Sequence, residues 1–300
     1  MGSALIISSL PFALGVVMLG LGLSLAADDF RRVLRNPRAA VVALLCQIVV
    51  MPVICFGLVL AFRLPPELAV GMMLLAASPG GPTANLYSHL FGGNVALSVS
   101  LTAINSGLVV VTMPIVVNLS AGYFLPDGAS LGLQFDKVVQ VFVIVVVPVA
   151  VGMLLRTRAP EVAQRLNRPV RALSVVVLLV VIGAVLYGER ANLAGYFVSV
   201  GLAVLAFNVV SLLIGYAGPR LAGVDRRAAI SAGFEIGIHN TAFTITIALS
   251  PALLNNPEMA IPGAVYGIIM FFTAVTFGWL VTRRRAQESV PGEPTPVELR

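Results

Sequence analysis

The sequence predicts an all-α, polytopic membrane protein with nine transmembrane helices, and three observations lead to this prediction. Of the 300 residues, 58% are hydrophobic and only 11% are charged, whereas a soluble domain carries about 25% charged residues. Nine stretches are long and apolar enough to cross a bilayer, which takes about 20 residues. The basic residues alternate between successive connections, as the orientation of membrane helices requires. This composition disfavours a soluble enzyme, a secreted domain and a disordered protein.

The nine predicted spans follow one another with short connections, and the third and eighth are interrupted by glycine and polar residues. The first stretch lacks a basic leading segment and a convincing cleavage site, so we expect it to be a retained span and not a signal peptide. The spans are Ala4–Ala26, Ala39–Phe62, Pro66–Leu90, Asn94–Leu119, Val138–Leu155, Val170–Tyr187, Leu193–Gly215, Arg227–Ser250 and Ile261–Val281.

The lysine and arginine residues predict the orientation of the spans. Only Arg63, Lys137 and Arg190 fall in one set of connections, and the other 16 of the 19 fall in the opposite set or in the tail. The richer set faces the cytoplasm by the positive-inside rule. We therefore expect a multi-pass protein of a bacterial plasma membrane, with its N-terminus outside and its C-terminus in the cytoplasm.

The expected partner of the basic residues is the lipid bilayer and not nucleic acid. They form no patch with interleaved aromatic residues, which nucleic-acid binding favours, and cationic loops suit anionic lipid. The two cysteines, Cys46 and Cys55, lie in one apolar stretch. We expect them to pack as small apolar residues and not to form a disulfide or a metal pair.

The chain divides into one transmembrane domain and a tail. We expect the transmembrane domain to cover residues 1–285, with a first half at 1–125 and a second half at 136–285. Residues 286–300 are rich in proline and glutamate, a composition that predicts a disordered cytoplasmic tail.

Two spans contain residues that a continuous helix does not tolerate. The third contains Pro79-Gly80-Gly81-Pro82, and each proline removes a backbone donor. The eighth holds Glu235 and Gly237. Backbone groups freed by a break cannot face lipid and must line a cavity or be buried in protein. If the first half lacks its first helix, the two breaks occupy equivalent places in two halves, which predicts an inverted-repeat transporter with a site at the bilayer midplane.

Several polar residues near the breaks are candidates for this site. Glu235 is the only carboxylate in the middle of a span; it needs a cation or a hydrogen-bond partner, or else it is protonated and joins helices. His239 shares its helix face if the helix is continuous; it serves coupling or substrate binding, or makes a packing hydrogen bond. Asn85, Ser98 and Thr102 offer neutral oxygens that suit sodium, or hydrogen bonds between helices.

The sequence is compatible with two roles for each of three further polar residues. Gln47 either ligates a cation or donates a hydrogen bond between helices. Asn105 and Asn208 either line the substrate cavity or hold helices together.

These motifs resemble the bile acid:sodium symporter family from about Leu10 to Trp279. The matching residues are Leu64-Pro65-Pro66-Glu67-Leu68-Ala69-Val70-Gly71, Pro79-Gly80-Gly81, Asn85, Gly93-Asn94-Val95-Ala96-Leu97-Ser98, Thr102, Glu235, Gly237, Asn240 and Pro262-Gly263-Ala264. The resemblance implies a prokaryotic member with nine spans that lacks the first helix of the family's ten. It also implies a panel domain and an inverted-repeat core in which the two broken helices cross.

The resemblance further implies one or two sodium sites. The first corresponds to Asn85, Ser98, Thr102 and Glu235, with Ala84 where the family usually has serine. The residues of the second are Glu235, Gln47, the carbonyls of Ile236 and Ile238, and His239, which replaces a glutamine.

The expected substrate-binding residues lie near the same breaks and in the last span. We expect the positive ends of the half-helices near Gly81 and Gly237 to favour the anionic group of the substrate. The predicted substrate-binding residues are Asn240, Pro82 (a threonine in the family), Met270, Phe271, Asn105 and Asn208.

The predicted function is secondary active transport, as sodium-coupled symport of a small amphipathic organic anion, either bile-acid-like or a small carboxylate. The alternatives are a proton-coupled or uniport anion carrier, an arsenite- or auxin-type carrier, and a non-transporting membrane sensor. No nucleophile–base pair or phosphate loop occurs in the sequence, so we do not expect an enzyme. The sequence leaves the oligomeric state open.

Overall fold

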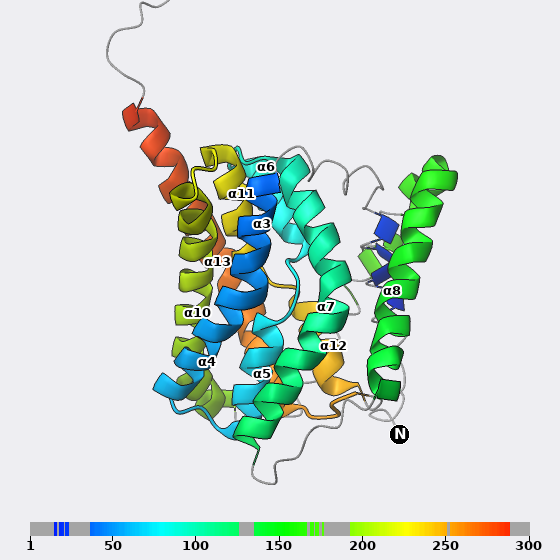
Figure 1. The fold of residues 1–300 in the computed structure, drawn as a ribbon, viewed down its shortest axis with the longest axis vertical. Coiled ribbons are helices and arrows are strands. Elements are labelled where there is room, and N and C mark those ends of the chain that lie inside the picture. Colours follow the sequence, from blue (N-terminus) through cyan, green and yellow to red (C-terminus); the bar gives the residue numbers. More distant parts are fainter. Residues whose placement is uncertain are drawn as a thin grey trace, which may run out of the picture.

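The fold is described from a computed structural model of the chain (Figure 1). It describes residues 37–125, 135–166, 193–250 and 253–288, together with isolated residues at 15–16, 18–20, 22–23, 169–170, 172–173 and 176. Every element in these ranges is a helix, apart from one isolated β-bridge, which confirms the all-α prediction. The first and sixth predicted spans and most of the tail lie outside the described ranges.

The second predicted span is one long helix with a local change of winding. It consists of α3 (Pro37–Leu45), the π-helical turn η1 (Cys46–Val50) and α4 (Met51–Ala61). Pro52 has no amide hydrogen and cannot donate a hydrogen bond to the preceding turn. Just before Pro52, the backbone hydrogen bonds have the wider spacing of a π-helix, and the Met51 amide donates to the Cys46 carbonyl. The wide turn contains Gln47, which is buried.

The third and eighth predicted spans are each divided into two short helices, as the sequence predicts. The third consists of α5 (Pro66–Ala76) and α6 (Pro82–Leu90), and the eighth of α11 (Arg226–Gly237) and α12 (Thr241–Leu249). Pro82 begins α6 and does not disrupt it, because the first helical position needs no amide donor. Asn240 directly precedes α12 and caps it, because its side-chain oxygen accepts a hydrogen bond from the Phe243 amide at 3.1 Å.

The remaining elements are α7 (Val95–Phe124), α8 (Phe135–Arg158), α10 (Leu193–Leu221), the short 3₁₀ turn η2 (Glu258–Ala260) and α13 (Ile261–Glu288). Four helical stretches among the described residues are long and apolar enough to cross a membrane: Pro37–Ala61, Val95–Phe124, Val200–Leu221 and Glu258–Arg283. The helix α13 continues three residues into the predicted tail. In Figure 1, α8 stands at one edge of the molecule beside α7, and α10 and α13 lie at the opposite edge.

The two linkers of the broken spans cross in the interior, about halfway along the helices (Figure 1). The Gly81 amide donates to the Ile238 carbonyl at 2.7 Å, and the Asn240 amide donates to the Pro79 carbonyl at 2.9 Å. Gly80 and His239 therefore form an antiparallel β-bridge. Because no water is available in the bilayer core, this pairing satisfies backbone groups that the breaks release from the helices.

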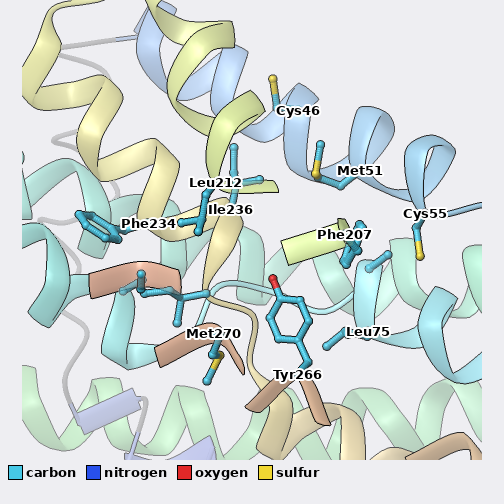
Figure 2. Packing of buried hydrophobic residues seen from close by; sticks show 14 of the residues in the cluster. Cys46, Met51, Cys55, Leu75, Phe207, Leu212, Phe234, Ile236, Tyr266 and Met270 are labelled. Atoms are coloured by element: carbon cyan, nitrogen blue, oxygen red, sulfur yellow. The ribbon is translucent and has the colours of Figure 1, made fainter. Parts of the chain in front are cut away.

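Apolar side chains surround the crossing and also cover the outside of the protein. Figure 2 shows Phe207, Tyr266, Phe234 and other members of the buried cluster that packs against the linkers. Large apolar side chains are exposed on the outer helices; they include Val53, Leu119, Val198 and Phe272. Exposed apolar surface of this extent suits contact with lipid.

The two cysteines contribute to the same packing. Cys46 and Cys55 are both buried and free, as the sequence predicts. The Cys55 thiol donates to the Met72 carbonyl at 3.3 Å, which ties α4 to α5.

Candidate functional site

Glu235 lies in the last turn of α11, beside the crossing, and is almost completely buried, with 2% of its surface exposed. Its Oε2 atom accepts hydrogen bonds from the hydroxyl of Thr102 at 2.7 Å and from the hydroxyl of Ser98 at 3.5 Å, both on α7. Ser88 of α6 donates in turn to the Ser98 hydroxyl at 3.2 Å. We call these four residues the carboxylate cluster.

The other oxygen of this carboxylate, Oε1, is buried and has no hydrogen-bond partner. It lies against Gly80 in the opposite linker, so closely that a Cβ atom at that position would overlap it. The absence of a side chain at Gly80 therefore allows the carboxylate to reach the crossing. A buried carboxylate oxygen without a donor is costly, and a bound cation removes that cost.

A second polar group, the imidazole cluster, lies at the α5–α6 linker and consists of Ser78, His239 and Gln47. The Gln47 side-chain amide donates to the Ser78 carbonyl at 3.0 Å. The His239 Nδ1 atom is 3.3 Å from the Ser78 hydroxyl and 3.4 Å from the Ser78 carbonyl. Its ring stacks on Phe207, with centroids 5.5 Å apart, and meets the Tyr266 ring edge-on at 5.3 Å.

These contacts determine where the proton of a neutral His239 resides. The Ser78 hydroxyl gives its own hydrogen to the Leu75 carbonyl at 2.7 Å, so both oxygens near Nδ1 act as acceptors. The proton is therefore assigned to Nδ1, and Nε2 carries a lone pair. Nε2 is buried without a partner, as is Gln47 Oε1.

The unpartnered atoms around the crossing are nearly all acceptors. Glu235 Oε1, Gln47 Oε1, Asn85 Oδ1 and His239 Nε2 are buried without a donor, and the exception is the donor Asn240 Nδ2. Asn85 lies three residues before Ser88 on α6, so the two share a helix face. A set of buried acceptors that lack donors is the pattern expected where a cation binds.

One expectation from the sequence, a positive helix end near Gly237, is wrong. Gly237 is the last residue of α11, so the helix end at that point is the negative, carbonyl end and not the positive end. Its carbonyl accepts hydrogen bonds from Asn208 and Tyr266, both at 2.9 Å. The positive end in the second half is the start of α12, four residues later. The expectation for Gly81 holds, because it precedes the first residue of α6.

The structure places the predicted substrate residues in different surroundings. Asn240 lies at the crossing. Both polar atoms of the Asn208 side chain have hydrogen-bond partners: its nitrogen donates to the Gly237 carbonyl, and its oxygen accepts from the Thr273 hydroxyl. Asn105 is buried next to Gln47 and lines a small pocket that also includes Ile48, Pro52, Ala77, Thr112 and Val116.

The other residues predicted to contact the substrate or the cation differ in their exposure. Pro82 is exposed, Met270 is buried in the main apolar cluster and Phe271 is 41% exposed. Ile236 and Ile238 are fully buried, and the Ile238 carbonyl already accepts from Gly81.

Three polar residues at the crossing were not predicted from the sequence as site residues: Ser88, Ser78 and Tyr266. Each bonds a predicted residue or the backbone of a break. Ser88 lies three residues after Asn85, and this spacing is the sequence signal that identifies it.

The site chemistry suits sodium better than a transition metal. Within the described ranges, no group of three or more His, Cys, Asp and Glu residues could hold a metal ion. Neutral hydroxyl and amide oxygens with one carboxylate are hard ligands, which transition metals favour less.

The chain belongs to the sodium bile acid symporter family. Residues 11–196 match the family's sequence model, which includes the first broken helix and the α6–α7 part of the carboxylate cluster. The protein is therefore a membrane transporter and not an enzyme, as predicted.

Three relatives illustrate the range of this family. The chain is 29% identical to the "Uncharacterized sodium-dependent transporter YocS" of Bacillus subtilis, over 85% of this chain and 77% of the relative. It is 28% identical to the "Probable sodium/metabolite cotransporter BASS2, chloroplastic" of Oryza sativa subsp. japonica, over 86% and 60%. It is 27% identical to the ileal sodium/bile acid cotransporter of Homo sapiens, over 94% and 81%. The names of all three relatives state that they are sodium-dependent transporters or sodium cotransporters.

Proposed function

We propose that this chain is a sodium-coupled symporter that carries a small amphipathic organic anion across a bacterial plasma membrane, with its N-terminus outside. The observation that carries the proposal is the unpartnered Glu235 Oε1, buried beside the crossing of two broken helices. An ionised carboxylate in this apolar interior needs a positive partner. The family and its sodium-dependent relatives support sodium for that role.

The carboxylate cluster and Asn85 are the proposed sodium ligands. Ser98, Thr102 and Asn85 add neutral oxygens to the single negative charge of Glu235. One carboxylate balances one monovalent cation, and neutral dipoles complete its shell without holding it so firmly that release becomes slow. The hydroxyls of Ser98 and Thr102 both bond Oε2 of Glu235, and Thr102 also bonds the Ser98 carbonyl of its own helix, so both hydroxyl oxygens lie within reach of a cation at this carboxylate.

The proposed second cation site lies at the imidazole cluster. Gln47 Oε1 and the lone pair of His239 Nε2 are its unpartnered acceptors, with the carbonyls of Ile236 and Ile238 as the predicted backbone ligands. Its remaining predicted ligand is Glu235, which it shares with the carboxylate cluster, so both sites depend on one negative charge. We therefore expect it to bind a cation more weakly than the carboxylate cluster.

The substrate anion is proposed to meet the positive helix ends at the crossing. Asn240 Nδ2 is a buried donor without an acceptor, at the start of α12. The start of α6, after Gly81, has no side-chain cap, and the positive end of this helix also favours an anionic ligand. A carboxylate or sulfonate bound there satisfies the Asn240 donor, and its apolar part contacts Met270 and Phe271.

Thermal unfolding of the purified full chain tests this function. We expect sodium chloride to raise the melting temperature relative to potassium chloride at equal ionic strength. A screen of bile acids and small carboxylates should then yield an anion whose stabilisation requires sodium. Uptake of that anion into proteoliposomes should follow an inward sodium gradient.

Two results of this experiment contradict the proposal. Stabilisation and uptake that are identical in potassium and in sodium exclude sodium coupling and support a uniporter. Uptake that follows a proton gradient without sodium supports the proton-coupled alternative.

A further inference from the structure

Each broken span is held at the crossing by one side-chain amide from a neighbouring helix. In the first half, Gln47 Nε2 donates to the Ser78 carbonyl at 3.0 Å. In the second half, Asn208 Nδ2 donates to the Gly237 carbonyl at 2.9 Å. Each of these carbonyls lies four residues before the next half-helix, α6 or α12, begins. The two amides therefore occupy equivalent places in the two halves.

The oxygens of the two amides differ in their surroundings. Asn208 Oδ1 accepts a hydrogen bond from the Thr273 hydroxyl of α13. Gln47 Oε1 is buried and has no partner, and an unsatisfied buried acceptor is costly. The protein thus supplies the partner of this oxygen in the second half, and the equivalent oxygen in the first half lacks one.

A small pocket lies beside Gln47. Its polar lining consists of Gln47, Asn105 and Thr112, and Ala77 in its wall places it next to Ser78 of the α5–α6 linker. Its volume is about 10 Å³, close to the minimum that holds one water molecule, about 10–15 Å³. The pocket is therefore too small for an organic group and fits one water molecule or one small ion.

Asn105 and Thr112 leave oxygens available to an occupant of this pocket. The Asn105 side chain is 4% exposed and takes part in none of the hydrogen bonds formed by the described residues. The Thr112 hydroxyl donates to the Leu108 carbonyl at 3.2 Å, so the lone pairs of its oxygen remain. A buried asparagine without a partner in the protein needs an explanation such as a bound water or ion.

We propose that this pocket belongs to the second cation site and that Asn105 is a further ligand of its cation. The missing partner of Gln47 Oε1 is a hydrogen-bond donor or a cation, because an amide oxygen only accepts. Asn105 Oδ1 and the Thr112 hydroxyl add neutral oxygens, which are hard ligands that suit sodium. The inference rests on the proposed function, since it requires a cation at the imidazole cluster. A water molecule is the alternative occupant that the experiment excludes.

The sharpest test adds a charge and keeps the shape of the side chain. Binding of radioactive sodium to the purified full chain in detergent gives the affinity of the stronger and the weaker site. We expect Asn105→Asp to raise the affinity of the weaker site by about tenfold, because the added carboxylate attracts the cation directly. Beside a water molecule, the same carboxylate gains no cation partner and should not raise the affinity.

A second variant removes the proposed ligand. Asn105→Leu fills a similar volume without an oxygen, and we expect it to lower the affinity of the weaker site by about tenfold, the effect of about one lost charge-assisted contact. The stronger site, at the carboxylate cluster, should keep its affinity, and this retained binding shows that each variant is folded.

The matched controls are Asn118→Asp and Asn118→Leu. Asn118 lies on the same helix, 13 residues after Asn105, which places it about 20 Å along the axis. It does not line the pocket. Neither control should change either sodium affinity.

Failure of Asn105→Asp to raise the affinity of the weaker site overturns the inference, and so does wild-type affinity in Asn105→Leu. The pocket then holds water alone. A wild type with a single sodium site also overturns the inference and leaves the proposed function intact. Absence of sodium binding to the wild type overturns the proposed function and this inference with it.

Discussion

The carboxylate cluster and the imidazole cluster both lie beside the crossing and differ in charge. The carboxylate cluster holds Glu235, whose hydroxyl partners come from α6 and α7. The imidazole cluster directs the hydrogens of Gln47 and His239 to the Ser78 carbonyl of the linker. The comparison leads us to expect that the first cluster contributes most to cation affinity, because it holds the carboxylate, and that the second contributes less, because its hydrogen bonds go to the linker.

Glu235→Gln is the variant with the largest expected effect. The amide keeps an acceptor for the Thr102 hydroxyl, so the fold should persist, but the charge that balances sodium is lost. We expect a loss of sodium affinity of about 100-fold or more, since removing one partner of a buried ion pair costs about 3–5 kcal/mol. Sodium-dependent thermal stabilisation and proteoliposome uptake measure this loss.

The control for this variant is Glu67→Gln, which changes a carboxylate in the first turn of α5. It should retain wild-type sodium dependence. If Glu235→Gln shows wild-type uptake, the carboxylate is not needed for coupling, and the two clusters do not differ in the way we expect.

Gly80→Ala is expected to have the next largest effect. Its methyl group would overlap the unpartnered carboxylate oxygen and also meet the Glu235 carbonyl oxygen at 2.8 Å. Overpacking of this kind costs about 1–3 kcal/mol, so we expect a lower melting temperature and a sodium affinity reduced by about tenfold. Gly107→Ala adds the same methyl group in open space and should match the wild type. Equal behaviour of the two alanine variants would show that Glu235 does not need the space at Gly80.

His239→Gln is expected to have the smallest effect on sodium affinity. Glutamine can still donate to the Ser78 carbonyl and offers an oxygen in place of the imidazole lone pair. The variant loses ring contacts with Phe207 and Tyr266, worth about 0.5–1.5 kcal/mol each, so we expect a lower melting temperature, comparable to that of Gly80→Ala. Sodium affinity should stay within about threefold of the wild type. A loss as large as that of Glu235→Gln would contradict the assigned difference between the clusters.

The sequence predicts the breaks and the buried acid correctly, because both follow from local chemistry. Proline and glycine in an apolar span indicate a break wherever the neighbouring helices lie, and helices α5 and α6 are indeed separate. The exact helix ends depend on more than the sequence pattern. Gly237 closes α11 because Tyr266 and Asn208, from helices distant in the sequence, bond its carbonyl, and its location at a negative helix end was not predicted.

The hydrogen-bond partners of the predicted site residues could not be predicted from the sequence. The spacing of Ser88 from Asn85 places it on the candidate face of α6, but only the approach of α6 to α7 shows that it bonds Ser98. The choice of hydrogen position on His239 likewise depends on Ser78, 161 residues away in the sequence. Such contacts arise from tertiary packing, which no local pattern encodes.

The β-bridge between Gly80 and His239 joins the backbones of the two linkers. Its hydrogen bonds join main-chain atoms of residues 79, 81, 238 and 240, so they survive most exchanges of side chain. A displacement of α11 is therefore transmitted to the α5–α6 linker through the backbone. The backbone at the crossing can therefore keep one shape, while the side chains around it can change to suit a different substrate.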